Sequence, residues 1–274
     1  MKSIIVPVDF SESSLNALRF AVQIAETVEA KLHLIHVIQS RKSVVSYLND
    51  TNIKTNESLA QKALDELVTN LRSKTAVPLE AKVYVGNIFN EISNVAKYNE
   101  ASLIVIGTHG LSGIEDLWIG STAYKVINNS PCPVLSIRQT FEVRPIKRIV
   151  LPIDYTPETR QKVPFIAEFA SMLGAEVHVL DICERNQIDL LPKIQHFKDQ
   201  VIDFLHKHKI SCISNSIRGT NLTNITIEYA ESVNADVIAI MTEQNAKTKN
   251  IWLGPYAQQM VNHSPIPILS IHPF

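Results

Sequence analysis

A run of glycines in the middle of the chain is the stretch whose residue types and spacing could bind a phosphate. Its members are Gly107, Gly110, Gly113 and Gly120, with Ser121 and Thr122 directly after the last glycine. Glycine lets a backbone approach an anion closely, and the unpaired N–H groups at the start of a helix attract negative charge. The stretch therefore indicates a phosphate site at the start of a helix predicted over 121–129.

Two common phosphate-binding motifs are absent from the sequence. A Walker A loop needs Gly-Lys followed by Ser or Thr, and a dinucleotide-binding loop needs Gly-x-Gly-x-x-Gly, and neither occurs. What stands instead is a spacing of two residues between Gly107 and Gly110, and of nine between Gly110 and Gly120. From the residues alone, a turn-rich connection between a strand and a helix remains the alternative interpretation.

An acidic residue is expected beside this loop. Asp9 follows the apolar segment 3–8, and a second apolar segment, 103–106, leads into the glycines. If the two segments are neighbouring strands of a doubly wound sheet, their carboxyl ends meet and Asp9 faces the loop. Its carboxylate can accept hydrogen bonds from a ribose hydroxyl or an adenine amine. The alternative is that Asp9 caps the helix that begins near Ser11, and the two roles are compatible.

The elements that must position these residues alternate along the chain. In the first half, the apolar pattern predicts strands at 3–8, 32–38, 79–85, 103–106 and 134–138, and helices at 11–28, 57–73, 88–99 and 121–129. The polar stretch 39–56 is expected to be a long loop. Alternating strands and helices indicate a parallel sheet with helices on both faces, whose ligands bind at the carboxyl ends of the strands. Val37, at such an end, can form an apolar wall for a base.

The chain contains an internal repeat. Residues 5–10 recur as 150–155, residues 30–34 as 175–179, and residues 129–137 as 263–271, always in the same order. A duplication therefore predicts an α/β protein of two tandem Rossmann-like, doubly wound domains, 1–140 and 141–274. Each domain is expected to hold a five-stranded parallel sheet.

Several short motifs together resemble the universal stress protein family, and the whole chain resembles a tandem member. They are Pro7-Val8-Asp9, His36-Val37, Val85-Gly86-Asn87, the glycine loop, and Ser130-Pro131-Cys132-Pro133-Val134. The resemblance implies an adenine nucleotide, ATP or else ADP or AMP, bound together with Mg²⁺. It also implies that the two copies pair through their fifth strands as an intramolecular pseudo-dimer, and it leaves a further homodimer open.

The resemblance also implies a place for each part of the nucleotide. The base would lie near Asp9, Val37 and Ile106. The ribose would lie near Gly107 and Gly110, and the phosphates on Gly120, Ser121 and Thr122.

The second copy departs from this pattern although it keeps an acid at Asp154. Aligning the repeats places Met241 at the position of Gly107, Gln244 at that of Gly110 and Pro255 at that of Ser121. A side chain where the backbone needs a positive φ costs about 1–2 kcal/mol, and proline lacks an N–H. We therefore expect the second site to be degenerate and blocked for a triphosphate.

Composition argues against several classes of partner. The net charge of −1 gives no general attraction to nucleic acid or to an acidic membrane, and no long apolar segment predicts a membrane span. The three cysteines show neither disulfide nor metal-ligand spacing, which together with the missing signal peptide favours a cytoplasmic protein.

Catalytic residues are scarce in the glycine loop. His109, Glu115 and Asp116 are its only candidates, and they form no recognisable catalytic constellation. The leading hypothesis is a nucleotide-binding stress sensor or regulator that is read by a partner protein. A slow, self-phosphorylating ATPase and a ligand-free scaffold are the alternatives.

Overall fold

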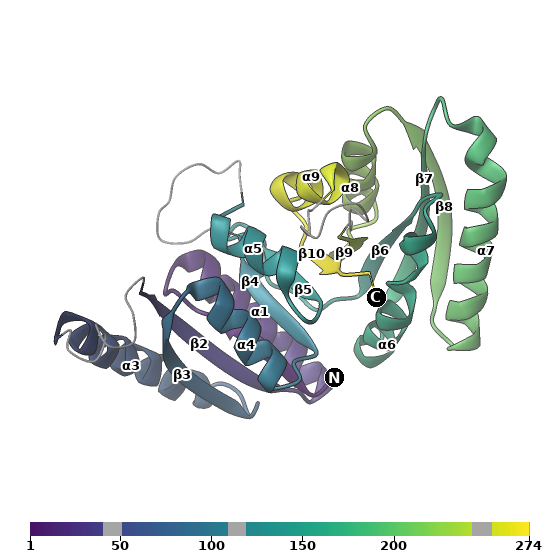
Figure 1. Ribbon diagram of the computed structural model, residues 1–274. Coiled ribbons are helices and arrows are strands. Elements are labelled where there is room, and N and C mark those ends of the chain that lie inside the picture. The colour runs from purple at the N-terminus through teal and green to yellow at the C-terminus, as the bar shows by residue number, and fades with distance from the viewer. Residues whose placement is uncertain (41–50, 109–118, 243–253, 274) are drawn as a thin grey trace.

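The computed structural model describes residues 1–40, 51–108, 119–242 and 254–273. Its strands form a single ten-stranded sheet in the order β3-β2-β1-β4-β5-β10-β9-β6-β7-β8 (Figure 1). The second half of this order mirrors the first, as expected for a duplicated α/β unit. The two tandem Rossmann-like domains are thus present and share one sheet.

The first domain alternates strands and helices as predicted. Its strands are β1 (Ser3–Pro7), β2 (Lys31–Gln39), β3 (Leu79–Gly86), β4 (Leu103–Gly107) and β5 (Val134–Ile137). Its helices are α1 (Glu12–Val28), α3 (Thr51–Arg72), α4 (Ile88–Tyr98) and α5 (Ser121–Asn129).

The expectation of a loop over 39–56 was wrong at its end, because α3 already begins at Thr51. A helix can continue beyond its apolar stripe through backbone hydrogen bonds alone, and such turns leave no hydrophobic period in the sequence. Arg41 and Lys42 lie outside the described residues.

The second domain repeats this order, and its described residues also include two 3₁₀ turns. Its strands are β6 (Arg148–Ile153), β7 (Glu176–Glu184), β8 (Cys212–Gly219), β9 (Val237–Met241) and β10 (Ile268–Ile271). Its helices are α6 (Val163–Leu173), α7 (Leu191–Lys207), α8 (Leu222–Ser232) and α9 (Pro255–His263), and its 3₁₀ turns are η1 (Pro157–Arg160) and η2 (Ile188–Leu190).

The two domains meet at their fifth strands. Within each domain the strand pairs are parallel, whereas β5 and β10 pair antiparallel, with Leu135 opposite Leu269. This is the pairing that the resemblance implies, and in Figure 1 the two domains lie on either side of it.

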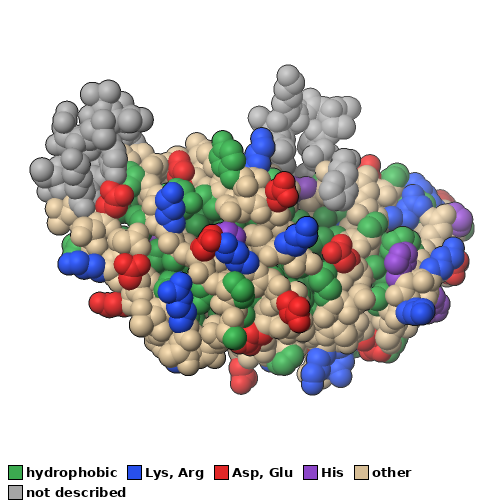
Figure 2. Space-filling model, turned by 90° about the horizontal axis from the view of Figure 1, so that it is seen from below, with side chains coloured by type: hydrophobic (Ala, Val, Ile, Leu, Met, Phe, Trp, Pro, Cys, Tyr) green, Lys and Arg blue, Asp and Glu red, His purple; other side chains and the backbone are tan. Residues whose placement is uncertain are grey.

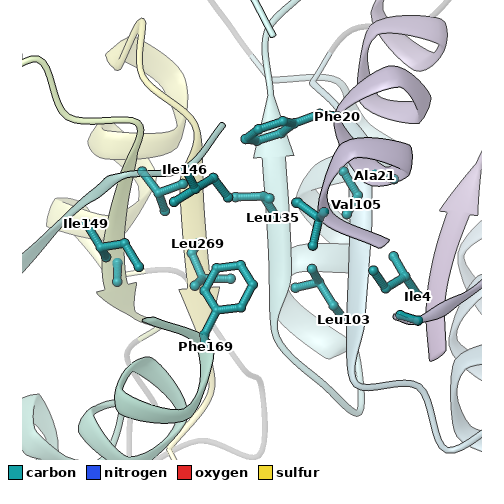
Figure 3. Packing of buried hydrophobic residues seen from close by; sticks show 14 of the residues in the cluster. Ile4, Phe20, Ala21, Leu103, Val105, Leu135, Ile146, Ile149, Phe169 and Leu269 are labelled. Carbon is teal, nitrogen blue, oxygen red and sulfur yellow. The ribbon is translucent and has the colours of Figure 1, made fainter. Parts of the chain in front are cut away.

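Apolar side chains cover both faces of the shared sheet. One cluster of buried residues draws on α1, α3, α6 and α7, and the other on α4, α5, α8 and α9. The first cluster runs without interruption from one domain into the other; Figure 3 shows Phe20 beside Leu135 and Phe169 beside Leu269 at the junction. The two domains therefore share one hydrophobic core as well as one sheet.

The segment that connects the domains is held at both ends. The Asn16 side-chain amide donates to the carbonyls of Arg138, Gln139 and Phe141, at 3.1, 3.3 and 2.9 Å. Asp236 accepts from the Arg144 guanidinium at 2.6 Å and from the backbone N–H groups of Lys147 and Arg148 at 2.8 and 3.0 Å. The connection is thus tied to α1 on one side and to the start of β9 on the other.

The outer surface carries both signs of charge. Figure 2 shows Lys and Arg side chains interspersed with Asp and Glu over one face of the molecule. In the part of the chain that the structure describes, no helix combines the length and the apolar character that crossing a membrane requires.

A buried ion cluster lies in the second domain. Asp181 of β7 is 1% exposed, and its carboxylate accepts from the Lys198 ammonium and the Arg218 guanidinium, each at 2.7 Å, and from the Ser216 hydroxyl. Burial by itself raises the pKa of Asp181, but the hydrogen bonds from Lys198, Ser216 and Arg218 outweigh it and hold this pKa below the ordinary value.

We expect Asp181→Asn to lower the free energy of unfolding by about 3–5 kcal/mol, because the buried Lys198 ammonium would lose its counter-ion. Since the folded-state pKa of Asp181 lies below the unfolded one, this stabilisation is complete at neutral pH and is lost as the pH falls through the folded-state value. Urea unfolding at several pH values measures both effects. Glu80→Gln, which breaks an exposed ion pair with Lys31, is the control and should lower the free energy of unfolding far less. Equal decreases for the two variants would contradict the prediction.

Candidate functional site

A cavity of about 190 Å³ opens at the carboxyl ends of β1 and β4. The predicted residues Asp9, Val37, Ile106, Gly107, Gly120, Ser121 and Thr122 all line it, and Gly110 lies outside the described residues. Eight further residues complete the wall: Pro7, Val8, Ser14, Ile35, Ile88, Ile92, Thr108 and Ala123. The structure thus brings together residues that are more than a hundred positions apart in the chain.

Asp9 lines this cavity and also supports the start of α1. One of its carboxylate oxygens accepts from the backbone N–H of Ser11 at 3.0 Å and from the Ser11 hydroxyl at 2.5 Å. Ser11 in turn caps the helix by accepting from the Ser14 N–H at 3.2 Å. Asp9 is therefore not the cap itself but orients the residue that is.

The turn after Asp9 is strained. Phe10 has a φ of 64°, a left-handed conformation that a bulky side chain rarely adopts. Its ring packs against that of His36 with centroids 5.0 Å apart, and the Nδ1 of His36 donates to the Val8 carbonyl at 2.7 Å. Packing and hydrogen bonding around the turn thus offset the strain, which fixes Asp9 at the edge of the cavity.

Gly107 is required for space and not for backbone conformation. The expectation of a positive φ at this position was wrong, because among the described glycines only Gly174 has one. A Cβ at Gly107 would instead lie 2.5 Å from the Ser13 hydroxyl oxygen and 2.7–2.8 Å from the Ser13 backbone. The glycine therefore permits close contact between the end of β4 and the first turn of α1.

The start of α5 faces the cavity without a side-chain cap. Gly120 is the N-cap residue; its N–H donates to the Thr108 carbonyl at 2.8 Å, and no side chain of the described residues caps the helix. Ser121, Thr122 and Ala123 form the first turn and line the cavity. The N–H groups of a first helical turn have no partner within the helix, so this end of the cavity suits an anion.

A residue of the second domain holds the approach to this helix. The backbone N–H of Ile119 donates to the side-chain oxygen of Asn262 at 3.0 Å, and Arg138 donates to the Asn262 carbonyl. Asn262 belongs to α9 and is 2% exposed. Its role had no signal in the sequence, because the contact joins positions 143 residues apart in different domains.

The second domain also has a cavity, of about 280 Å³, at the carboxyl ends of β6 and β9. Met241 lines it at the position of Gly107, and Pro255 is the first residue of α9. In the first domain, α1 begins at Glu12, three residues after Asp9. In the second domain, the 3₁₀ turn η1 follows Asp154 instead, and α6 begins only at Val163. A side chain at the end of β9 needs this different helix start, since the close contact seen at Gly107 leaves no room for one. Gln244 lies outside the described residues.

Comparison with known proteins agrees with this architecture. The family model described as universal stress protein family matches residues 1–138 and again residues 145–272. The chain belongs to the universal stress protein family. The double match confirms the tandem arrangement that the motifs indicated.

Individual relatives match one domain at a time. A universal stress protein of Methanocaldococcus jannaschii is 31% identical over 140 residues, covering 50% of this chain and 82% of its own length. The universal stress protein YxiE of Bacillus subtilis is 33% identical over 145 residues, covering 49% of this chain and 97% of its own.

A solved structure matches the whole chain. The crystal structure of a universal stress protein from Archaeoglobus fulgidus covers 98% of both chains with a TM-score of 0.78 and 18% identity. At this identity the likeness concerns the fold alone, and it extends across both domains.

We expect Gly107→Ala to destabilise the protein by about 1–3 kcal/mol, because the added methyl group would overlap the Ser13 backbone. Gly120→Ala is the matched control: its Cβ would approach only the Thr108 carbonyl oxygen, at 3.2 Å, so its loss should be smaller. Urea unfolding of the two variants measures the difference. A loss from Gly120→Ala as large as that from Gly107→Ala would show that the contact with Ser13 is not the constraint.

Proposed function

We propose that this universal stress protein is a stress-response regulator that binds an adenine nucleotide in the cavity of its first domain. The observation that carries the proposal is the pairing, within one cavity, of an uncapped helix start and a carboxylate beside apolar walls. The first suits phosphate, and the second suits the base and its sugar.

The two ends of the cavity divide the nucleotide between them. At one end, the side chains of Val37 and Ile106 offer apolar contact to a flat base, and the Asp9 carboxylate can accept from a ribose hydroxyl or the adenine amine. At the other, Gly120, Ser121 and Thr122 present the N-terminus of α5 to the phosphates. We propose ATP with Mg²⁺ as the ligand, with ADP or AMP as alternatives.

We propose that bound nucleotide changes a surface of the protein and that a partner protein in the cytoplasm reads the change. The residues considered for hydrolysis, His109, Glu115 and Asp116, lie outside the described residues.

Titration calorimetry of nucleotide-free protein with ATP and Mg²⁺ tests the proposal, and we expect one site. Ser121→Pro should weaken the binding of ATP at least tenfold, which is about 1.4 kcal/mol of binding free energy, because it removes one N–H from the start of α5. It should not unfold the protein: Gly120 has a φ of −60° and a ψ of 144°, which a following proline accepts, and α9 already begins with Pro255.

Ser121→Ala is the control, since it keeps the N–H and should leave most of the affinity. Adenosine should bind Ser121→Pro as well as it binds the wild type, because it has no phosphate. If the wild type binds no nucleotide, the proposal is wrong; if Ser121→Pro binds ATP normally, the phosphates do not lie at this helix.

We also expect Asn262→Ala to weaken the binding of ATP about fivefold, because the Ile119 N–H beside Gly120 would lose its acceptor. A change of this size corresponds to the net free energy of roughly one hydrogen bond. Affinity for adenosine should not change. Asn262→Asp keeps an acceptor oxygen and serves as the control. Amide exchange at Ile119 reports the contact directly; faster exchange with unchanged ATP affinity would show that the contact does not position the phosphate site.

A further inference from the structure

The cavity of the second domain carries two charged residues, Glu158 and Lys162, that have no charged counterpart among the described residues lining the first cavity. Its apolar wall comes from Ile182, Ile240 and Met241. The turn that joins β6 to α6 also lines the cavity, through Asp154, Glu158, Thr159 and Lys162. In the repeat, Lys162 stands where the first domain has the small residue Ala17.

Lys162 is a buried cation at this cavity. It is 2% exposed, and its ammonium donates to the carbonyl and the hydroxyl oxygen of Thr159, at 2.8 and 3.2 Å. Burial lowers the pKa of Lys162 to about 8, against the opposing effect of Asp154, so the group is still mostly protonated at pH 7. A protonated amine has three N–H donors, and the described residues account for two of them.

Asp154 supplies the complementary acceptor. One of its carboxylate oxygens accepts from the Thr156 N–H at 2.7 Å and from the Thr156 hydroxyl at 2.5 Å. The other carboxylate oxygen has no hydrogen-bond partner within the described ranges. The same short turn therefore brings one ammonium donor and one carboxylate acceptor to the cavity wall.

The charges and donors of this cavity disfavour a phosphate. Two carboxylates, of Asp154 and Glu158, and one ammonium, of Lys162, are the charged groups among the described residues that line it. At the start of α9, Pro255 has no N–H to offer, and the Tyr256 hydroxyl already donates to the Thr226 hydroxyl oxygen at 3.1 Å. Among the described lining residues the charge is therefore net negative, which disfavours an anionic ligand.

We propose that this cavity binds an uncharged ligand that carries two adjacent hydroxyl groups beside an apolar ring face. One hydroxyl would donate to the free oxygen of Asp154, and its neighbour would accept from Lys162, because a hydroxyl can do either. The ring would lie on Ile182, Ile240 and Met241. A sugar and a nucleoside share this chemistry, and the site does not depend on nucleotide binding in the first domain.

Hydrogen exchange read by mass spectrometry tests the proposal, because it reports each domain separately. The probes are adenosine, 2′-deoxyadenosine, D-ribose and ATP. We expect adenosine to slow exchange in residues 154–163 and 2′-deoxyadenosine, which lacks one hydroxyl, to need at least a tenfold higher concentration. Protection by adenosine alone identifies a nucleoside, and equal protection by ribose identifies a free sugar.

Two variants assign the effect to the proposed groups. Asp154→Asn and Lys162→Met should each abolish the protection of residues 154–163, and unfolding by urea shows whether each variant is folded. Asp9→Asn, at the matching position of the first domain, should leave it unchanged.

Three outcomes for the exchange of residues 154–163 would overturn the proposal. The first is that neither adenosine nor D-ribose protects them. The others are that 2′-deoxyadenosine, or ATP, protects them as strongly as adenosine does. Exchange in residues 154–163 reports the second cavity and exchange in residues 9–17 reports the first, so failure of nucleotide binding in the first domain is seen separately.

Discussion

The antiparallel hydrogen bonds between β5 and β10 are the interaction on which the rest of the molecule depends. Each domain alone would end in an exposed strand edge, and open edges invite pairing with other chains. By pairing with each other, the two fifth strands remove both inner edges and place Leu135 opposite Leu269. One continuous core can then extend across the junction, and α9 comes close enough for Asn262 to reach Ile119.

A second constraint, the close approach of a strand end to a helix start, separates the two cavities. In the first domain Gly107 lets β4 end against the first turn of α1. In the second domain Met241 stands at that position, and a 3₁₀ turn precedes a later helix start. This altered turn is what carries Lys162 to the second cavity, so a change at one strand end accounts for new chemistry on the neighbouring element.

The sequence was sufficient for the fold and for most of the first cavity. Short apolar runs such as 103–106 identify buried strands, and the repeated blocks identify the duplication. The glycine spacing and the resemblance select residues that do line one cavity. Distances in space were not predictable: Gly107 meets Ser13 across a gap of more than ninety residues, and Asn262 lies in the other domain. Such contacts leave no local periodicity.

The segment that connects the two domains has a consequence for how the molecule can evolve. A homodimer of single domains is encoded once, so every substitution appears in both halves and both sites must change together. Here Asn16 and Asp236 hold the connecting segment of one chain against both halves. The pairing of the halves is therefore kept by covalent linkage, and selection can act on one site while the other is preserved.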